Sequence, residues 1–372
     1  MNKIAIIAVI VVAALVGVAG VSVVQNSGNG GSDNGSDNGS DNGSGSGSGE
    51  GSSAEKYTFK DAKGVEHNVE VPLQNVSVVH KYIPIFMKIL GVEKSVAGLD
   101  KTYGMTFSKY FENSFNVGTY SAPDGETMLQ HGSKVLLTPV TMGISNPDAL
   151  RDLGIEVIYL DLTDPFAIKD SLLVLANLMG GTPEIMANYN AYIAIFESCF
   201  TKARSYDLSA HADDYFGLHM ASSGFFQTHT SSAVKVIESV SGKCYTNVID
   251  KDVRDTVYFS QEREVLTTFD NDYTLDYMFV YTLDPAENFS KFFDYGGNLH
   301  YENLTCVKEG RLFSLGADTV NGALSCVSSL LYAKAFGADI GTSAEDAITQ
   351  LNTTFGLEFS TENLLVAYTP TA

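Results

Sequence analysis

Hydrophobic and polar residues divide the first 55 residues of the chain into two unlike segments. An uncharged apolar run extends from Ile4 to Val24, and as a helix it would be about 31 Å long, enough to cross a bilayer. Lys3, the only early charge, favours a cytoplasmic N-terminus. The small residues "GVAG" within the run leave a cleaved signal peptide as the alternative. Residues 1–25 are therefore predicted to be a transmembrane anchor or a signal segment.

The second segment, residues 26–55, consists mainly of Gly, Ser, Asn and Asp and has no apolar residue before Ala54. Such a composition cannot bury a core, so it predicts a disordered tether with a root-mean-square span of about 30 Å. Asn-X-Ser/Thr sequons in this tract are compatible with the outer face of a membrane. We therefore expect the folded part to lie at the cell surface, anchored by the N-terminal helix or secreted if that helix is cleaved.

From residue 56 onward, short apolar runs alternate with helical patterns. Two alternating runs within Tyr57–Pro72 flank the turn signal "DAKG" and predict a β-hairpin. Compact apolar runs then predict buried strands, and the segments between them predict helices, one of which ends at Gly91. The predicted strands are Asn75–His80, Ser95–Asp100, Lys134–Pro139 and the second half of Asn146–Asp161. This alternation is typical of a parallel sheet covered by helices on both faces.

Helical periodicity dominates between Phe166 and Ser205. Thr182 is a suitable N-cap and Pro183 a suitable first residue for one long helix, in which apolar residues recur every three or four positions. Such a helix of about 20 residues would be about 30 Å long. After it the α/β alternation resumes, with a hairpin predicted over Cys306–Leu315 and a closing helix over Gly322–Gly337.

The pattern therefore predicts an α/β fold of two lobes with mainly parallel sheets, joined by one long α-helix, with a ligand cleft between the lobes. The predicted divisions are an N-terminal lobe over 56–165, a helical connector over 166–205 and a C-terminal lobe over 206–372. Ligands of such sheets bind at the carboxyl ends of the strands.

Composition narrows the functional classes. The 372 residues are 44% hydrophobic and carry a net charge of −21, which disfavours nucleic acid as a partner because phosphate binding needs a basic surface. The chain has no GxSxG nucleophile motif and no HExxH motif, so we expect no enzyme. The four cysteines show no metal-binding spacing, and disulfides and buried thiols both remain open.

The order of these segments resembles the extracytoplasmic substrate-binding proteins of iron-siderophore, haem and cobalamin ABC importers. The likeness covers about residues 56–372 and rests on the opening hairpin, "ILGVEKSVAGLDKT", "NVGTYSAPDGETMLQHGSKVLL", the long helix and "VKEGRLFSL". It implies no intrinsic cofactor, an iron-siderophore, haem or corrinoid ligand, and an ABC permease dimer with a cytoplasmic ATPase as partner. A cobalamin-binding protein of the same class and a non-transport adhesin or sensor are the alternatives.

The resemblance also implies one exposed carboxylate on each lobe for docking to arginines of the permease. Glu126 in "DGETML" matches the first position, where a carboxylate in a first helical turn stays ionised and can bind an arginine fork. The second position departs from the family pattern, and Glu264 is favoured there over Glu262. A helix-start acid without a partner protein is the structural alternative for Glu126.

Residues that follow the predicted strands are the candidates for contact with the ligand. Aromatic side chains there can stack on a flat macrocycle or a catecholate ring, Tyr or His can ligate haem iron, and Arg can meet an anionic chelate. The candidates are His80, Tyr82, Tyr103, Tyr120, Phe225, Phe226 and Arg254. The absence of Trp counts against cobalamin, and scattered histidines count against a zinc or manganese site. An iron chelate, siderophore or haem, is the favoured ligand.

Overall fold

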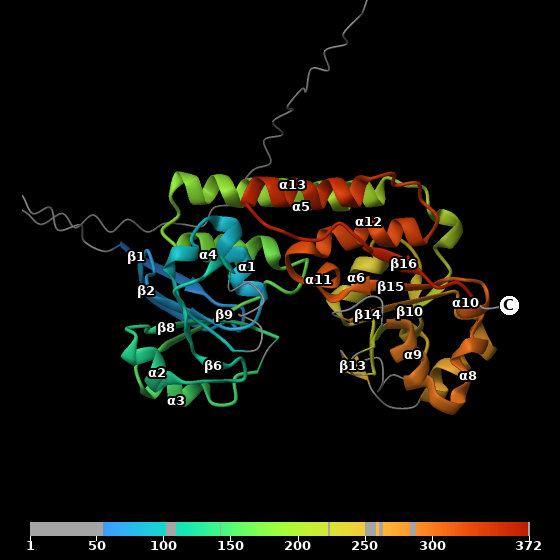
Figure 1. Cartoon of the computed structure of the whole chain (residues 1–372), viewed down its shortest axis with the longest axis horizontal. Coiled ribbons are helices and arrows are strands. Elements are labelled where there is room, and N and C mark those ends of the chain that lie inside the picture. The colour runs from blue at the N-terminus through green and yellow to red at the C-terminus, as the bar shows by residue number, and fades with distance from the viewer. Residues whose placement is uncertain are drawn as a thin grey trace, which may run out of the picture. The chain divides into compact units, whose positions relative to one another are not determined.

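The computed structural model describes residues 55–101, 109–141, 143–221, 224–249, 258–259, 263–282 and 288–370, all within a folded unit that spans Ser53–Ala372. Figure 1 shows this unit as two α/β lobes with long helices lying across both. The predicted anchor and nearly all of the predicted linker lie outside the described residues. Within the described ranges, no helix combines the length and apolarity that a membrane crossing requires.

The first lobe is built on a five-stranded sheet in which every pairing is parallel. Its strands, in the order β5-β4-β3-β8-β9, are Phe115–Asn116, Val96–Leu99, Val76–Val78, Val135–Pro139 and Glu156–Leu160. The connecting helices are α1 (Tyr82–Leu90), α2 (Gly125–Gln130) and α3 (Pro147–Asp152), and a small β6–β7 ladder pairs Gly118–Thr119 with Ala122–Pro123. These elements confirm the strand–helix alternation expected from the sequence.

The predicted hairpin is also present, with β1 at Glu55–Lys60 and β2 at Glu66–Val71. Asp61 holds its turn, because one carboxylate oxygen accepts the backbone N–H groups of Lys63 and Val65. This side-chain acceptor adds to the backbone bonds of the turn, in which Gly64 N–H donates to the Asp61 carbonyl and Asp61 N–H to the Val65 carbonyl.

The long helix α5 extends over Pro183–Arg204, and the Thr182 side chain accepts the N–H of Ile185 at its start as predicted. At 22 residues it is about 33 Å long. A break at Gly180-Gly181 separates it from α4 (Ile168–Leu178). It contacts α1 and α4 of the first lobe and α12 and α13 of the second, so it connects the two lobes (Figure 1).

The second lobe is built on a seven-stranded sheet in the order β13-β11-β10-β14-β15-β16, with β12 paired to β10. Its strands are β10 (Tyr215–Met220), β11 (Phe225–Gln227), β12 (Lys243–Cys244), β13 (Tyr258–Phe259), β14 (Tyr277–Thr282), β15 (Leu312–Gly316) and β16 (Leu365–Ala367). The central pairings β10–β14 and β14–β15 are parallel, and the flanking pairings of β11, β13 and β16 are antiparallel. The prediction of a mainly parallel sheet therefore describes the centre of this lobe.

Helices cover this second sheet. They are α6 (Ser232–Glu238), α8 (Arg263–Tyr273), α9 (Asn288–Gly296), α10 (Thr305–Lys308), α11 (Ala317–Val320), α12 (Ser325–Ala335) and α13 (Ser343–Phe355). Short 3-10 turns lie at η1 (Glu93–Ser95), η3 (Ser209–His211), η4 (Tyr245–Asn247), η6 (Gly297–Leu299), η7 (Tyr301–Asn303) and η8 (Gly322–Leu324).

The hairpin predicted over Cys306–Leu315 is wrong. Its first half is helix α10, whose Cys306 and Val307 are buried, and its second half is β15, which pairs in parallel with β14. Gly310 has a φ of 69° and ends the helical segment instead of joining two strands. All four cysteines are buried free thiols in the structure.

Candidate functional site

The carboxyl ends of β3 and β4 bring His80 and Asp100 together. The His80 backbone N–H donates to Asp100 Oδ1 at 2.6 Å, and Asp100 is fully buried. His80 itself adopts a left-handed φ of 69°, so the chain turns sharply as it leaves β3. Asp100 was not among the predicted site residues, although its place directly after an apolar strand was a usable signal.

Three of the predicted ligand residues form an aromatic group at this strand end. The ring centroids of His80 and Tyr82 are 4.7 Å apart, and those of His80 and Tyr120 are 6.2 Å apart in an edge-on arrangement. Both tyrosines are partly exposed, whereas His80 is buried. Burial, and next the positive charge of Lys81, lower the pKa of His80 to about 4. At neutral pH the group therefore presents an uncharged imidazole beside two phenols.

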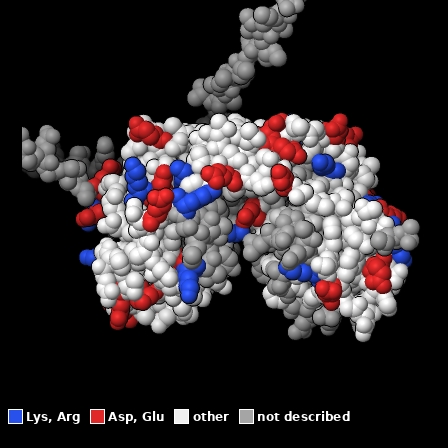
Figure 2. All heavy atoms as spheres, viewed as in Figure 1, with Lys and Arg blue, Asp and Glu red and all other residues white. Residues whose placement is uncertain are grey.

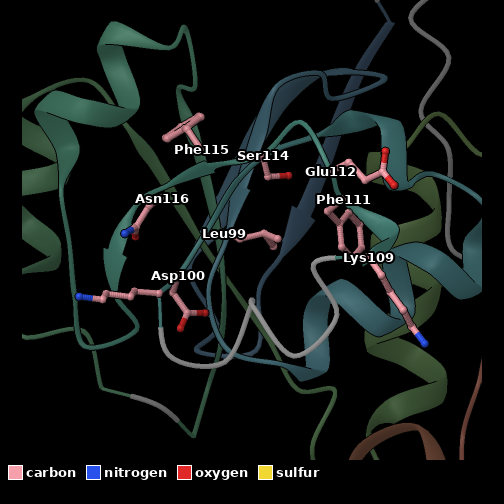
Figure 3. A pocket seen from close by; sticks show the side chains of 9 residues that line it. Leu99, Asp100, Lys109, Phe111, Glu112, Ser114, Phe115 and Asn116 are labelled. Atoms are coloured by element: carbon pink, nitrogen blue, oxygen red, sulfur yellow. The ribbon is translucent and has the colours of Figure 1, made fainter.

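A cavity of about 530 Å³ lies beside this group, at the end of β4 and along β5. Figure 3 shows Phe115 and Asn116 on one side of it and Phe111, Glu112 and Lys109 on the other. Leu99 and Asp100 contribute to its lining. Its volume is within the range of small-molecule sites in proteins.

The two lobes meet close to His80. Lys81, the next residue, forms an ion pair with Asp318 of α11, which follows β15 in the second lobe. The Tyr82 ring packs on Gly322, where an added Cβ would lie 2.4 Å from Tyr82 Cδ1. Helix α1 contacts η8, which follows α11, beneath α5 (Figure 1), and Figure 2 shows the surface hollowed between the lobes below this junction. The predicted cleft thus has its closed end at a contact between the carboxyl ends of the two sheets.

In the second lobe, Phe225 and Phe226 differ in environment. Phe225 is 36% exposed, whereas Phe226 is 3% exposed and packs against His219, Tyr245 and Tyr295. Successive side chains of a strand point to opposite faces of the sheet, so only one of the two can face the cleft. Phe226 is therefore packed in the core of the lobe, and its contact with a ligand stays a prediction.

The docking candidate of the first lobe is on the surface. Glu126 is exposed in the first turn of α2, next to the N-cap Asp124, whose carboxylate accepts the N–H of Thr127. In the part of the chain that the structure describes, no ion pair involves Glu126. Its position is therefore accessible to another protein.

Four of the predicted site residues lie wholly or partly outside the described residues. Tyr103, Arg254 and Glu262 lie outside the described residues. The backbone of Glu264 belongs to α8, but its side chain is outside them as well. The described residues contain no group of three or more His, Cys, Asp or Glu side chains that could hold a metal ion.

No protein-family model and no curated protein matches the chain, but solved structures share its fold. A periplasmic solute binding protein from Veillonella parvula DSM 2008 has a TM-score of 0.60 at 14% identity, over 83% of this chain and 96% of that one. An ABC-type Fe3+-hydroxamate transport system protein from Saccharomonospora viridis DSM 43017 has a TM-score of 0.58 at 14% identity, over 76% and 99%. A periplasmic heme binding protein from Pseudomonas aeruginosa has a TM-score of 0.55 at 14% identity, over 81% and 100%. These likenesses confirm the predicted fold of two lobes joined by a helix.

Proposed function

We propose that this chain is the extracytoplasmic solute-binding component of an ABC importer, which captures an iron chelate and delivers it to a membrane permease. The observation that carries the proposal is the arrangement of two α/β lobes on α5 with the carboxyl ends of both sheets directed to one cleft. Near-complete coverage of binding proteins for haem and for Fe3+-hydroxamate transport supports the same function. The chelate is a ferric siderophore or haem.

Ligand contact is assigned to the aromatic group on the first lobe and to Phe225 on the second. The ring centroids of Tyr82 and Tyr120 lie 4.7 Å and 6.2 Å from that of His80, beside a cavity large enough for a small chelate. Aromatic faces and edges suit a flat or aromatic ligand, and a neutral imidazole or a phenol can ligate iron in haem. Tyr103 and Arg254 remain predicted contributors.

Docking to the permease is assigned to one carboxylate on each lobe. Glu126 is the candidate on the first lobe, and Glu264, or else Glu262, is the candidate on the second. A bidentate arginine–carboxylate pair fixes the orientation of two proteins more than it raises their affinity. The N-terminal segment would hold the chain near the membrane, and a cytoplasmic ATPase would complete the importer.

The test separates binding from transport. The full chain in detergent micelles is titrated with ferric siderophores and haem, followed by tyrosine fluorescence and the Soret band, and uptake is measured in cells. We expect Glu126→Gln to reduce uptake by about tenfold, as the loss of one charged contact of about 1.4 kcal/mol would, with ligand affinity unchanged. Glu66→Gln, at an exposed site on β2 of the same lobe, is the matched control and should change neither.

Two results would count against this assignment. Loss of ligand affinity in Glu126→Gln would show that the residue acts in binding, and normal uptake in that variant would remove the docking role. Binding of no iron chelate or haem by the full chain would overturn the proposed function as a whole.

A further inference from the structure

The ion pair at the closed end of the cleft joins an enclosed lysine to a more exposed carboxylate. The Lys81 side chain is 7% exposed and that of Asp318 is 46% exposed. Enclosing an ammonium group without a counter-charge costs desolvation free energy, and the carboxylate of Asp318 supplies that counter-charge. Without Asp318, the charge of Lys81 would attract an anion into the cleft. The two residues are far apart in sequence, and only the meeting of β3 and β15 at their carboxyl ends brings them together.

The other described charges near this point add no positive excess. Asp100 is buried at the end of β4 and accepts the His80 backbone N–H. Along the cavity, Lys101 and Lys109 are accompanied by Glu112, and Lys109 also forms an ion pair with the exposed Glu358.

His80, which lies between these groups, is uncharged at neutral pH. The lysines of the cleft end, Lys81, Lys101 and Lys109, are therefore matched by at least as many carboxylates, Asp100, Glu112, Asp318 and Glu358. A bound anion would find no surplus cation among these described groups, and the predicted contributor Arg254 lies outside them.

We propose that the cleft selects an iron(III) chelate without net negative charge, of the tris-hydroxamate type, over a trianionic tris-catecholate chelate, because Asp318 cancels the charge of Lys81. The inference rests on the proposed function. Three singly charged hydroxamates neutralise iron(III), whereas three doubly charged catecholates leave the complex strongly negative. Haem, with two propionates, also brings negative charge. In a cleft of low polarity, each uncompensated negative charge on the ligand lowers its affinity.

The experiment removes the compensating charge while keeping the side chain's size. Full chain in detergent micelles, wild type and Asp318→Asn, is titrated with an uncharged ferric trihydroxamate, a trianionic ferric tricatecholate and haem, at low and at high salt. Asp213→Asn is the matched control, because Asp213 pairs with Lys243 on the surface, before β10 and so at the opposite end of that strand from the cleft.

In the wild type we expect the trihydroxamate to bind at least about tenfold more tightly than the tricatecholate, with little dependence on salt. Asp318→Asn should tighten tricatecholate binding by about tenfold and leave trihydroxamate binding within about twofold, because only the anion gains a partner. Asp213→Asn should leave both affinities as in the wild type.

The inference is overturned if the wild type prefers the tricatecholate or haem, or if Asp318→Asn changes both siderophore affinities equally. In either case the proposed function survives, because a chelate still binds. Binding of none of the three ligands would instead overturn the proposed function and the inference with it.

Discussion

The junction between the lobes depends on a glycine that a larger residue should disrupt. Gly322 begins η8 with a φ of 70°, and an added Cβ would lie 2.4 Å from Cδ1 and 2.7 Å from Cε1 of Tyr82. Tyr82 is the first residue of α1 in the other lobe, so Gly322→Ala forces the ring of one lobe away from the backbone of the other. We expect this substitution to destabilise the protein and to loosen the contact between the lobes.

The magnitude has two parts. A non-glycine residue in the left-handed region costs about 1–2 kcal/mol, and overpacking a filled contact costs about 1–3 kcal/mol, which gives about 2–5 kcal/mol for Gly322→Ala. Gly132 supplies the control, because its φ is 72° and its added Cβ would meet nothing within 4 Å. Gly132→Ala should therefore cost only the backbone part, about 1–2 kcal/mol.

The assay is urea unfolding of the full chain in detergent, followed by far-UV circular dichroism because the chain has no Trp. The free energies of unfolding of the two variants are compared, and Gly322→Ala is repeated in a Tyr82→Ala background. Without the ring, the alanine should cost only the backbone part, so the two substitutions should couple by about 1–3 kcal/mol. Equal costs for Gly322→Ala and Gly132→Ala, or no coupling to Tyr82→Ala, would refute the packing argument.

Three further predictions concern buried groups. Among the residues that the structure describes, neither ring nitrogen of His219 has a hydrogen-bond partner, and burial lowers the pKa of His219 to about 3 from 6.5. The folded form therefore resists protonation, and stability falls as the pH drops below 6.5. His219→Phe should remove up to about 1.4 kcal/mol per pH unit of that loss in urea unfolding at pH 4–6, unlike exposed His300→Phe, and an unchanged pH slope would refute this. Tyr192→Phe removes the hydroxyl that donates to the Ala323 carbonyl and should cost about 1 kcal/mol; no loss would mean that water replaces the bond. Burial raises the pKa of the Cys244 thiol to about 12, so iodoacetamide at pH 8 should label it only in urea, and native labelling seen by mass spectrometry would contradict its burial.

The sequence predicted the elements whose signals are local. The capped start of α5 at Thr182-Pro183, the stop of α1 at Gly91 and the hairpin turn at Asp61 all depend on residues within one or two turns of the chain. The buried strands of the first sheet were likewise predicted from short, continuous apolar runs. Short-range preference and the final structure agree there, so periodicity and capping were sufficient.

Prediction failed where two local structures fit the same pattern. Apolar residues on both sides of Glu309-Gly310 suit a hairpin, and they suit a helix followed by a strand equally well. Tertiary pairing decides between the two structures. Leu312–Gly316 pairs in parallel with β14, and Cys306 packs in the core as part of helix α10. Helix α13 and strand β16 were not predicted as elements, because α13 packs on α5 and β16 pairs with β15, both of which are distant in the sequence.

In the cleft, too, the candidate residues could be predicted from the local sequence, whereas the charge balance depends on tertiary contacts. The rule that ligands bind after parallel strands singled out His80 and Tyr82 as candidates, and the structure brings their rings together at the end of β3. Strand alternation, if applied, would have separated Phe225 from Phe226. The charge of the cleft could not be obtained this way. The sequence places Lys81 directly after a strand but does not show its pairing with Asp318 across the lobes, which favours an uncharged ligand. Ligand selection is therefore a property of the contact between the lobes, and a change that separates them without altering any aromatic side chain should shift the preference toward anions.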